Sequence, residues 1–213
     1  MRGWKSNSVY KEVTRVAATT SPSLLLRIRN PEDEDAWQEF HAIYSSVVRA
    51  YCFQRQLQPP DADDITQEVM ATVATRIRNF EYDPGKGRFR GWLGTITMNR
   101  IRDWWEKKNR RSNMVVSEIP EAMAGGDSDW VAVFSEQIFR IACERIRSQF
   151  NSQTWQSFED AWVRNLPPQE IAQQLGIALH TVYVNKSRVL KRLEEEVRLL
   201  AEDIAIPNGN LKG

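Results

Sequence analysis

The segment Phe89–Arg111, FRGWLGTITMNRIRDWWEKKNRR, combines aromatic rings with positive charge. Rings can stack on unpaired bases, and Lys and Arg side chains can neutralise phosphates. The positive charge begins upstream of this segment, and the basic residues are Arg76, Arg78, Lys86, Arg88, Arg90, Arg100, Arg102, Lys107, Lys108, Arg110 and Arg111. The acidic residues that oppose them are Glu81, Asp83, Asp103 and Glu106. The mixture is typical of a surface that binds single-stranded nucleic acid.

The same segment has the periodicity of a helix. Its apolar face consists of Phe89, Leu93, Ile96, Ile101 and Trp104, and its polar face of Thr95, Asn99, Arg102 and Glu106. Adjacent residues on a helix point about 100° apart, so Trp104 and Trp105 cannot both point to the centre of one core. We expect Trp92 and Trp105 to flank the apolar face, partly exposed. A core helix with a charged back remains the alternative for these rings.

A second candidate site lies in LPPQEIAQQLGIALHTVYVNKSRVLKRL, residues 166–193. Pro168 opens a short helix, Gly176 can adopt the left-handed turn, and the pattern then continues into a second helix, as in a helix-turn-helix. The outward side of the second helix carries His180, Thr181, Val184, Ser187, Arg188 and Lys191. Such a helix presents side chains to base edges in the major groove and Lys and Arg to phosphates. A helical hairpin with a solvated basic face is the alternative.

Two further amphipathic helices precede the basic segment. The first begins at Asn30–Asp33, with acidic residues in its first turn. The second begins at Pro59–Asp61, and its apolar face consists of Ile65, Val69, Val73, Ile77 and Phe80. Its polar face includes Asp64, Gln67 and Glu68. No strand alternation is present, so the pattern predicts an all-α protein.

The predicted protein has two small helical domains joined by a flexible linker. Residues 112–133 include Pro120 and the Gly125–Gly126 pair and have no sustained period, which is typical of a linker. The predicted order is an N-terminal arm (1–23), a helical domain (24–111), the linker (112–133), a helix-turn-helix domain (134–205) and a tail (206–213).

Composition excludes several classes of function. The chain has 213 residues and a net charge of +1, so nucleic-acid binding must depend on local clusters of charge. The two cysteines and two histidines have no metal-binding spacing, and no catalytic constellation is recognisable. We therefore expect neither an enzyme nor a bound metal or cofactor. No apolar run approaches membrane-spanning length and no signal peptide is apparent, so we expect a cytoplasmic protein with no membrane partner.

Three motifs in this order resemble those of bacterial RNA polymerase sigma factors of the compact extracytoplasmic-function (ECF) group. DADDITQEVM (61–70) resembles the acidic helix that binds the coiled coil of the largest polymerase subunit. NFEYDPGKGRFRGWLGTITMNRIRDWW (79–105) resembles the segment that opens the minus-ten promoter element. The helix-turn-helix resembles the domain that reads the minus-thirty-five element. The resemblance implies sigma regions 2 and 4 for the two domains.

The resemblance also implies roles for individual residues. Core polymerase would be bound by Asp64, Gln67 and Glu68. The opened minus-ten strand would be contacted by Phe80, Arg88, Arg90, Trp92, Asn99, Arg100 and Arg102, with Phe80 and Asn99 on an extruded base. The minus-thirty-five duplex would be contacted by the outward face of 180–191. An anti-sigma protein is a further kind of partner, although no residue identifies one.

The recognition helix departs from the family pattern in one place. Many relatives carry a Lys-Ser-Arg run after Thr-Val, whereas this chain has Tyr183-Val184-Asn185, so we expect a different minus-thirty-five preference. The alternative function is a conventional helix-turn-helix repressor or activator. That alternative accounts for residues 166–193 but leaves the acidic helix and the basic-aromatic segment unexplained.

Overall fold

The structure is a computed structural model, and it describes residues 22–80, 89–112 and 127–200. The described residues form helices joined by turns and contain no strand, which confirms the all-α prediction. They fall into two compact units, which lie within residues 22–138 and 139–200, and the boundary lies within one helix. Most of the expected arm and of the expected linker, residues 81–88 and the tail lie outside the described residues, and α2 already begins at Pro22, within the expected arm.

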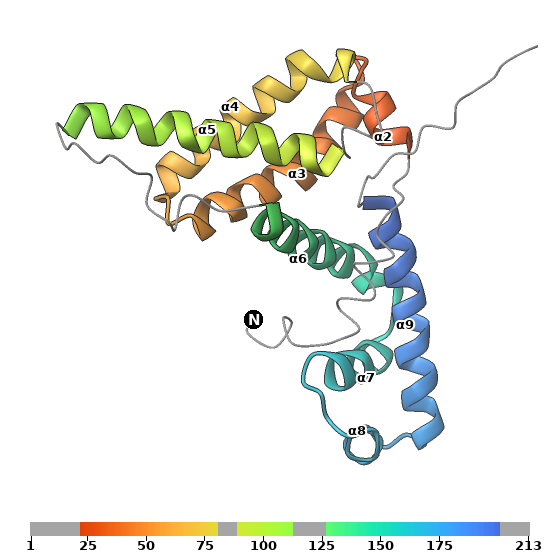
Figure 1. Cartoon of the computed structure of the whole chain (residues 1–213). Helices are drawn as coiled ribbons and strands as arrows, with labels where there is room; N and C mark the ends of the chain where they lie inside the picture. Colours follow the sequence, from red (N-terminus) through yellow and green to blue (C-terminus); the bar gives the residue numbers. More distant parts are fainter. Residues whose placement is uncertain (1–21, 81–88, 113–126, 201–213) are drawn as a thin grey trace, which may run out of the picture. The chain divides into compact units, whose positions relative to one another are not determined.

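The described residues of the first unit form α-helices and a short 3-10 turn, and Figure 1 shows the helices. In chain order they are α2 (Pro22–Arg27), α3 (Glu34–Gln54), α4 (Pro59–Arg76), η2 (Ile77–Asn79), α5 (Phe89–Ser112) and the first part of α6 (Asp127–Ile146). Its core is aromatic and aliphatic, with Phe40, Tyr44, Phe89 and Leu93 all fully buried. The helix starts expected near Asp33 and Pro59 are confirmed.

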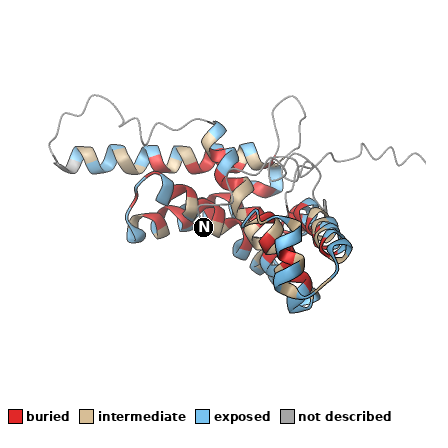
Figure 2. Ribbon diagram, turned by 90° about the horizontal axis from the view of Figure 1, so that it is seen from below, coloured by how far each residue is buried: buried red, intermediate tan, exposed pale blue. Residues whose placement is uncertain are grey.

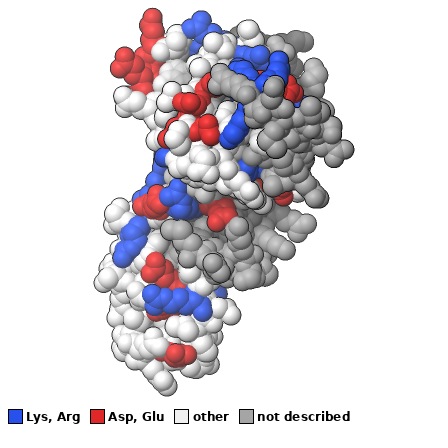
Figure 3. All heavy atoms as spheres, turned by 90° about the vertical axis from the view of Figure 1, so that its left-hand side faces the viewer, with Lys and Arg blue, Asp and Glu red and all other residues white. Residues whose placement is uncertain are grey.

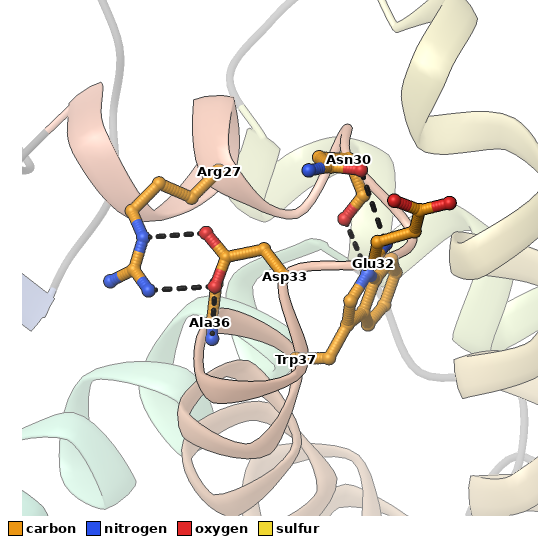
Figure 4. Close-up of polar contacts among 6 residues, drawn as sticks. All are labelled: Arg27, Asn30, Glu32, Asp33, Ala36 and Trp37. Atoms are coloured by element: carbon orange, nitrogen blue, oxygen red, sulfur yellow. Dashed lines mark hydrogen bonds and ion pairs between the residues drawn. The ribbon is translucent and has the colours of Figure 1, made fainter.

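Side-chain hydrogen bonds fix the corner between α2 and α3 (Figure 4). Asp33 is the N-cap of α3, because its Oδ1 accepts from the Ala36 N–H at 3.0 Å. Arg27 donates to both carboxylate oxygens of Asp33, at 2.9 and 2.8 Å. The bonds from Arg27 and from the Ala36 N–H lower the pKa of Asp33. On the other side of the corner, Trp37 Nε1 donates to the Asn30 carbonyl at 3.2 Å.

The start of α6 corrects the expected linker boundary. We predicted an unpatterned linker over 112–133, but α6 begins at Asp127, and Trp130 is only 2% exposed. Trp130 packs edge-on against Tyr51, with ring centroids 5.2 Å apart. Its Nε1 donates to the Arg90 carbonyl at 2.8 Å. Trp130 and Val133, which are both buried, therefore belong to the core of the first unit, although the local Gly and Asp content of the sequence favoured a linker.

The second unit contains the end of α6, η3 (Arg147–Gln149), α7 (Ser152–Trp162), α8 (Pro168–Leu175) and α9 (Leu179–Leu200). Asn151 is the N-cap of α7, and its side chain accepts from the Thr154 N–H at 2.7 Å. Phe139, Phe158 and Trp162 form a stacked aromatic core. Figure 2 shows that the buried residues of both units lie on the inward sides of the helices.

Candidate nucleic-acid interfaces

The outward face of α4 carries the three residues expected to bind polymerase. Asp64, Gln67 and Glu68 are all exposed. They lie within about one helical turn of each other, so they form one polar surface. The opposite face is buried through Ala62, Ile65, Thr66 and Val69. Two prolines occupy the first positions of α4, where a missing N–H costs no hydrogen bond.

The polar face of α5 agrees with the sequence pattern. Thr95, Asn99, Arg102 and Glu106 are all exposed, and Leu93, Ile96 and Ile101 are buried. From Arg102 to Arg110 no residue of α5 is buried, so this end of the helix projects from the core (Figure 2). Asn99 and Arg102 therefore present a polar surface one turn long. Arg88 lies outside the described residues.

Three aromatic rings meet between the end of η2 and the start of α5. The Phe80 and Trp92 rings are 4.8 Å apart, and the Phe89 ring lies 5.9 Å from Phe80 and 5.6 Å from Trp92. Phe89 is buried, whereas Phe80 and Trp92 are half-buried. The cluster thus has a fixed inner ring and two outer rings with accessible surface. The partial exposure expected for Trp92 is confirmed.

Arg29 is a residue that the sequence did not single out. Its Nη2 donates to the Phe80 carbonyl at 2.7 Å. The bond spans 51 positions and joins the turn after α2 to the residue that ends η2. A hydrogen bond to a charged donor is stronger than a neutral one, so Arg29 restrains the backbone of Phe80. No local pattern could have identified it.

The Trp104–Trp105 pair has a mixed environment. Trp104 Nε1 donates to Asp61 Oδ1 at 3.1 Å, and Lys108 Nζ lies 4.5 Å from the Trp104 ring centroid. Both rings are half-buried, so Trp104 lies at the edge of the apolar face rather than in its centre. Trp105 Nε1 is buried without a hydrogen-bond partner within the described ranges. Neither indole is a simple core residue.

The helix-turn-helix predicted from the sequence is present in the second unit. Gly176 ends α8 with φ 62° and ψ 36°, a left-handed conformation that glycine adopts without strain. The Ile177 N–H then donates to the Ala172 carbonyl at 3.0 Å and closes the turn. Ile171, Val182, Val189 and Leu193 are buried between the helices, as expected.

The exposed side of α9 agrees with five of the six expected positions. His180, Val184, Ser187, Arg188 and Lys191 are exposed, and Thr181 is half-buried. Asn185, which was not among the expected outward positions, is only 6% exposed. Its Nδ2 donates to Ser157 Oγ on α7 at 3.2 Å. Asn185 therefore joins the two helices, and Tyr183 and Val184 remain as the outward part of the Tyr183–Asn185 run.

Part of the chain is similar to a known protein family. Residues 41–111 match the family model described as Sigma-70 region 2, which spans the end of α3, α4 and α5. This segment is therefore similar to region 2 of the sigma-70 family. The chain is also 25% identical over 177 residues to the ECF RNA polymerase sigma factor RpoE of Cereibacter sphaeroides. That alignment covers 82% of this chain and 93% of the relative, so the resemblance to ECF sigma factors is confirmed.

A solved structure of the RsbN–BldN complex contains a chain that is similar to this one. The identity is 20% and the TM-score is 0.32, with coverage of 80% of this chain and 97% of that chain.

Within the segment that matches region 2, Arg100 lies between two surfaces to which the sequence analysis gave different partners. Its Nη2 donates to Thr72 Oγ1 on α4 at 3.1 Å. Its Nη1 lies 3.8 Å from Glu68 Oε2 and 3.6 Å from Asp103 Oδ2. Arg100 was expected on the minus-ten strand and Glu68 on the polymerase. In the structure the two side chains are neighbours across α4 and α5.

The positive charge of α5 is partly neutralised by nearby acidic side chains. Arg110 pairs with Glu106 at 3.3 Å, in addition to the contacts of Arg100. Exposed pairs of this kind contribute at most about 1 kcal/mol and break readily for a stronger anion. Figure 3 shows basic and acidic side chains interspersed on the face that it draws.

Over residues 22–80, 89–112 and 127–200, no group of three His, Cys, Asp or Glu side chains is arranged to hold a metal ion. None of the helices described there has the length and apolar character needed to cross a bilayer.

Proposed function

We propose that the chain is an ECF sigma factor that binds core RNA polymerase, recognises and opens promoters, and starts DNA-templated transcription in the cytoplasm. The observation that carries this proposal is the region 2 match over residues 41–111, which includes both the acidic face of α4 and the basic-aromatic α5. Its role is not enzymatic, because the polymerase supplies the catalysis. The exposed Asp64, Gln67 and Glu68 would bind the polymerase.

The aromatic cluster suits capture of an unpaired base of the minus-ten element. Extruding a base costs a few kcal/mol, and stacking on an aromatic ring returns about 1–3 kcal/mol per base. Phe80 and Trp92 are half-buried, and the buried Phe89 ring packs against both of them. In this proposal Asn99 provides hydrogen bonds to a base edge. Arg88, Arg90 and Arg102 would hold the phosphates, while Arg100 would orient Glu68 as well as meet the strand.

The exposed side of α9 would read the minus-thirty-five element in the duplex. Side chains near the start of a recognition helix reach base edges, and basic side chains farther along reach phosphates. The residues near the start of α9, which would reach base edges, are His180, Thr181, Val184 and Ser187. The basic residues farther along, which would reach phosphates, are Arg188 and Lys191. In this proposal the hydroxyl of the half-buried Thr181 would reach a base edge near the start of α9.

The test is co-elution of the purified chain with bacterial core RNA polymerase in size-exclusion chromatography. We expect a one-to-one complex, and we expect the double variant Gln67→Ala with Glu68→Ala to lose it. Interface hot spots are worth about 2 kcal/mol or more, which corresponds to at least about a thirty-fold weaker Kd. Gln169→Ala with Glu170→Ala is a matched control, because this Gln-Glu pair is also exposed but lies on α8.

Two results would count against the proposal. Equal polymerase affinity for the wild type and the Gln67/Glu68 variant would remove the assigned interface. Failure of the wild type to bind polymerase, together with tight binding to duplex DNA alone, would indicate a conventional helix-turn-helix repressor or activator.

A further inference from the structure

The start of α9 exposes an unusual amount of apolar surface. Leu179, Tyr183 and Val184 are 38%, 52% and 38% exposed. They are three of the seven large apolar side chains that are exposed in the described part of the chain, and they fall within six consecutive positions. Exposed apolar residues that gather in one place mark a binding surface more often than those scattered singly.

Val184 lies in the middle of the outward face of α9. Residues three and four apart on a helix are neighbours, so Val184 is flanked by His180, Ser187 and Arg188. All three neighbours are exposed. Val182, two positions before Val184, and Asn185, one position after it, are both buried against the rest of the unit. Val184 is therefore an apolar spot surrounded by groups that can hydrogen-bond or carry charge.

The polar surroundings indicate which partner meets this spot. A protein partner would be expected to extend the apolar surface, whereas Val184 is flanked by an imidazole, a hydroxyl and a guanidinium. These groups match the acceptors of base edges and phosphates. In the major groove the apolar feature of a base pair is the C5-methyl group of thymine, which aliphatic side chains contact.

We propose that Val184 determines part of the minus-thirty-five specificity by packing against a thymine C5-methyl group. The proposal rests on the proposed function, because it requires α9 to lie in the major groove of a promoter. His180 and Ser187 would hydrogen-bond the neighbouring base edges, and Arg188 would fix the register through a phosphate.

The test begins with the full-length chain assembled with core polymerase. Upstream elements are selected from a promoter library randomised around the minus-thirty-five position. Each thymine in the selected element is then replaced by uracil, which lacks only the C5-methyl group. We expect one or two positions at which this change weakens binding about four-fold, the effect of losing one buried methyl-sized group.

The variant Val184→Asn should remove this dependence on the methyl group, so that thymine and uracil templates bind equally well at those positions. Leu199→Asn is the matched control, since Leu199 is an exposed apolar residue of the same helix, 50% exposed, outside the 180–191 face. We expect this control to keep the four-fold difference. Both substitutions are at exposed positions, and circular dichroism checks that the helices remain.

Several outcomes would overturn the inference. Uracil substitution without effect at every selected thymine would show that no methyl group is read. An equal loss on thymine and uracil templates in Val184→Asn would assign Val184 to folding or general affinity. A change of oligomeric state in that variant, with unchanged promoter binding, would make the surface a contact between copies of the chain. Absence of any polymerase complex would instead defeat the proposed function itself.

Discussion

At the scale of single residues, the expected DNA contacts on α5 fall into two kinds. Arg102 is exposed on the polar face, whereas Arg100 is already engaged with Thr72 and Glu68. Both were expected to hold the minus-ten backbone. Their different surroundings predict different consequences of removing them, although the change of side chain is the same.

We expect Arg102→Ala to weaken promoter binding by the polymerase complex and to leave the melting temperature of the chain unchanged. Loss of one phosphate contact should reduce the slope of log affinity against log salt by about one. The measurement is a salt titration of promoter affinity beside a thermal melt. A slope equal to that of the wild type would remove Arg102 from the DNA interface.

Arg100→Ala is the companion variant. Its removal should lower stability by up to about 1 kcal/mol, because the ion pairs are partly exposed. It should also weaken polymerase binding, because Glu68 loses the neighbour that orients it. If Arg100→Ala instead matched Arg102→Ala in salt slope, with unchanged polymerase affinity, Arg100 would be a phosphate contact and not a positioning residue.

At the scale of elements, the packing of α6 against α5 depends on one glycine. A Cβ at Gly94 would lie 2.7 Å from two atoms of the Trp130 indole. That ring cannot simply withdraw, since it is buried and bonded to the Arg90 carbonyl. Gly94 therefore allows α5, the helix of the proposed minus-ten contacts, to approach α6 closely.

We expect Gly94→Ala to destabilise the chain by about 1–3 kcal/mol, the usual effect of overpacking a core. Gly91→Ala is the matched control on the same helix, where a Cβ would have no neighbour within 4 Å. There the gain in helix propensity should stabilise by up to about 1 kcal/mol. Urea denaturation measures both. Similar free energies of unfolding for the two variants would contradict the close packing.

At the scale of the whole molecule, each unit contains one buried cysteine. Cys52 lies in the first unit and Cys143 in the second. Burial raises the pKa of both thiols to about 12. The thiolate is the reactive form, so both cysteines should be inert at pH 8 while their units are folded. Each thiol thus reports the opening of its own unit.

We expect Cys143→Ser and Cys52→Ser, each of which leaves one thiol, to react with a disulfide reagent at different rates as urea increases. In water at pH 8 both should react about a thousand-fold or more slowly than an unfolded chain. Burial raises the pKa of the Cys52 thiol, so folding favours its protonated form. The stability that the protonated thiol contributes is full below pH 9.0 and is lost as the pH rises from there toward about 12. Identical urea profiles would mean that the units unfold together.

Local patterns in the sequence determined the helices and their exposed faces. The polar face of α4, the Thr95–Glu106 face of α5 and the outward side of α9 follow from a period of 3.6 residues, because burial on one side of a helix requires it. The prolines at the start of α4 and the left-handed Gly176 follow from local backbone chemistry. The order of three motifs then indicated a resemblance to sigma factors, and the region 2 match over residues 41–111 supports that resemblance.

Contacts between distant residues were decided only by the tertiary structure. The Arg29–Phe80, Asp61–Trp104 and Ser157–Asn185 hydrogen bonds join positions 51, 43 and 28 residues apart. The packing of Trp130 into the first unit, which shortened the expected linker, is of the same kind. A periodic pattern reports which side of a helix is buried. It carries no information on which helix covers that side, because many partners offer equivalent apolar surface and only the folded chain selects one.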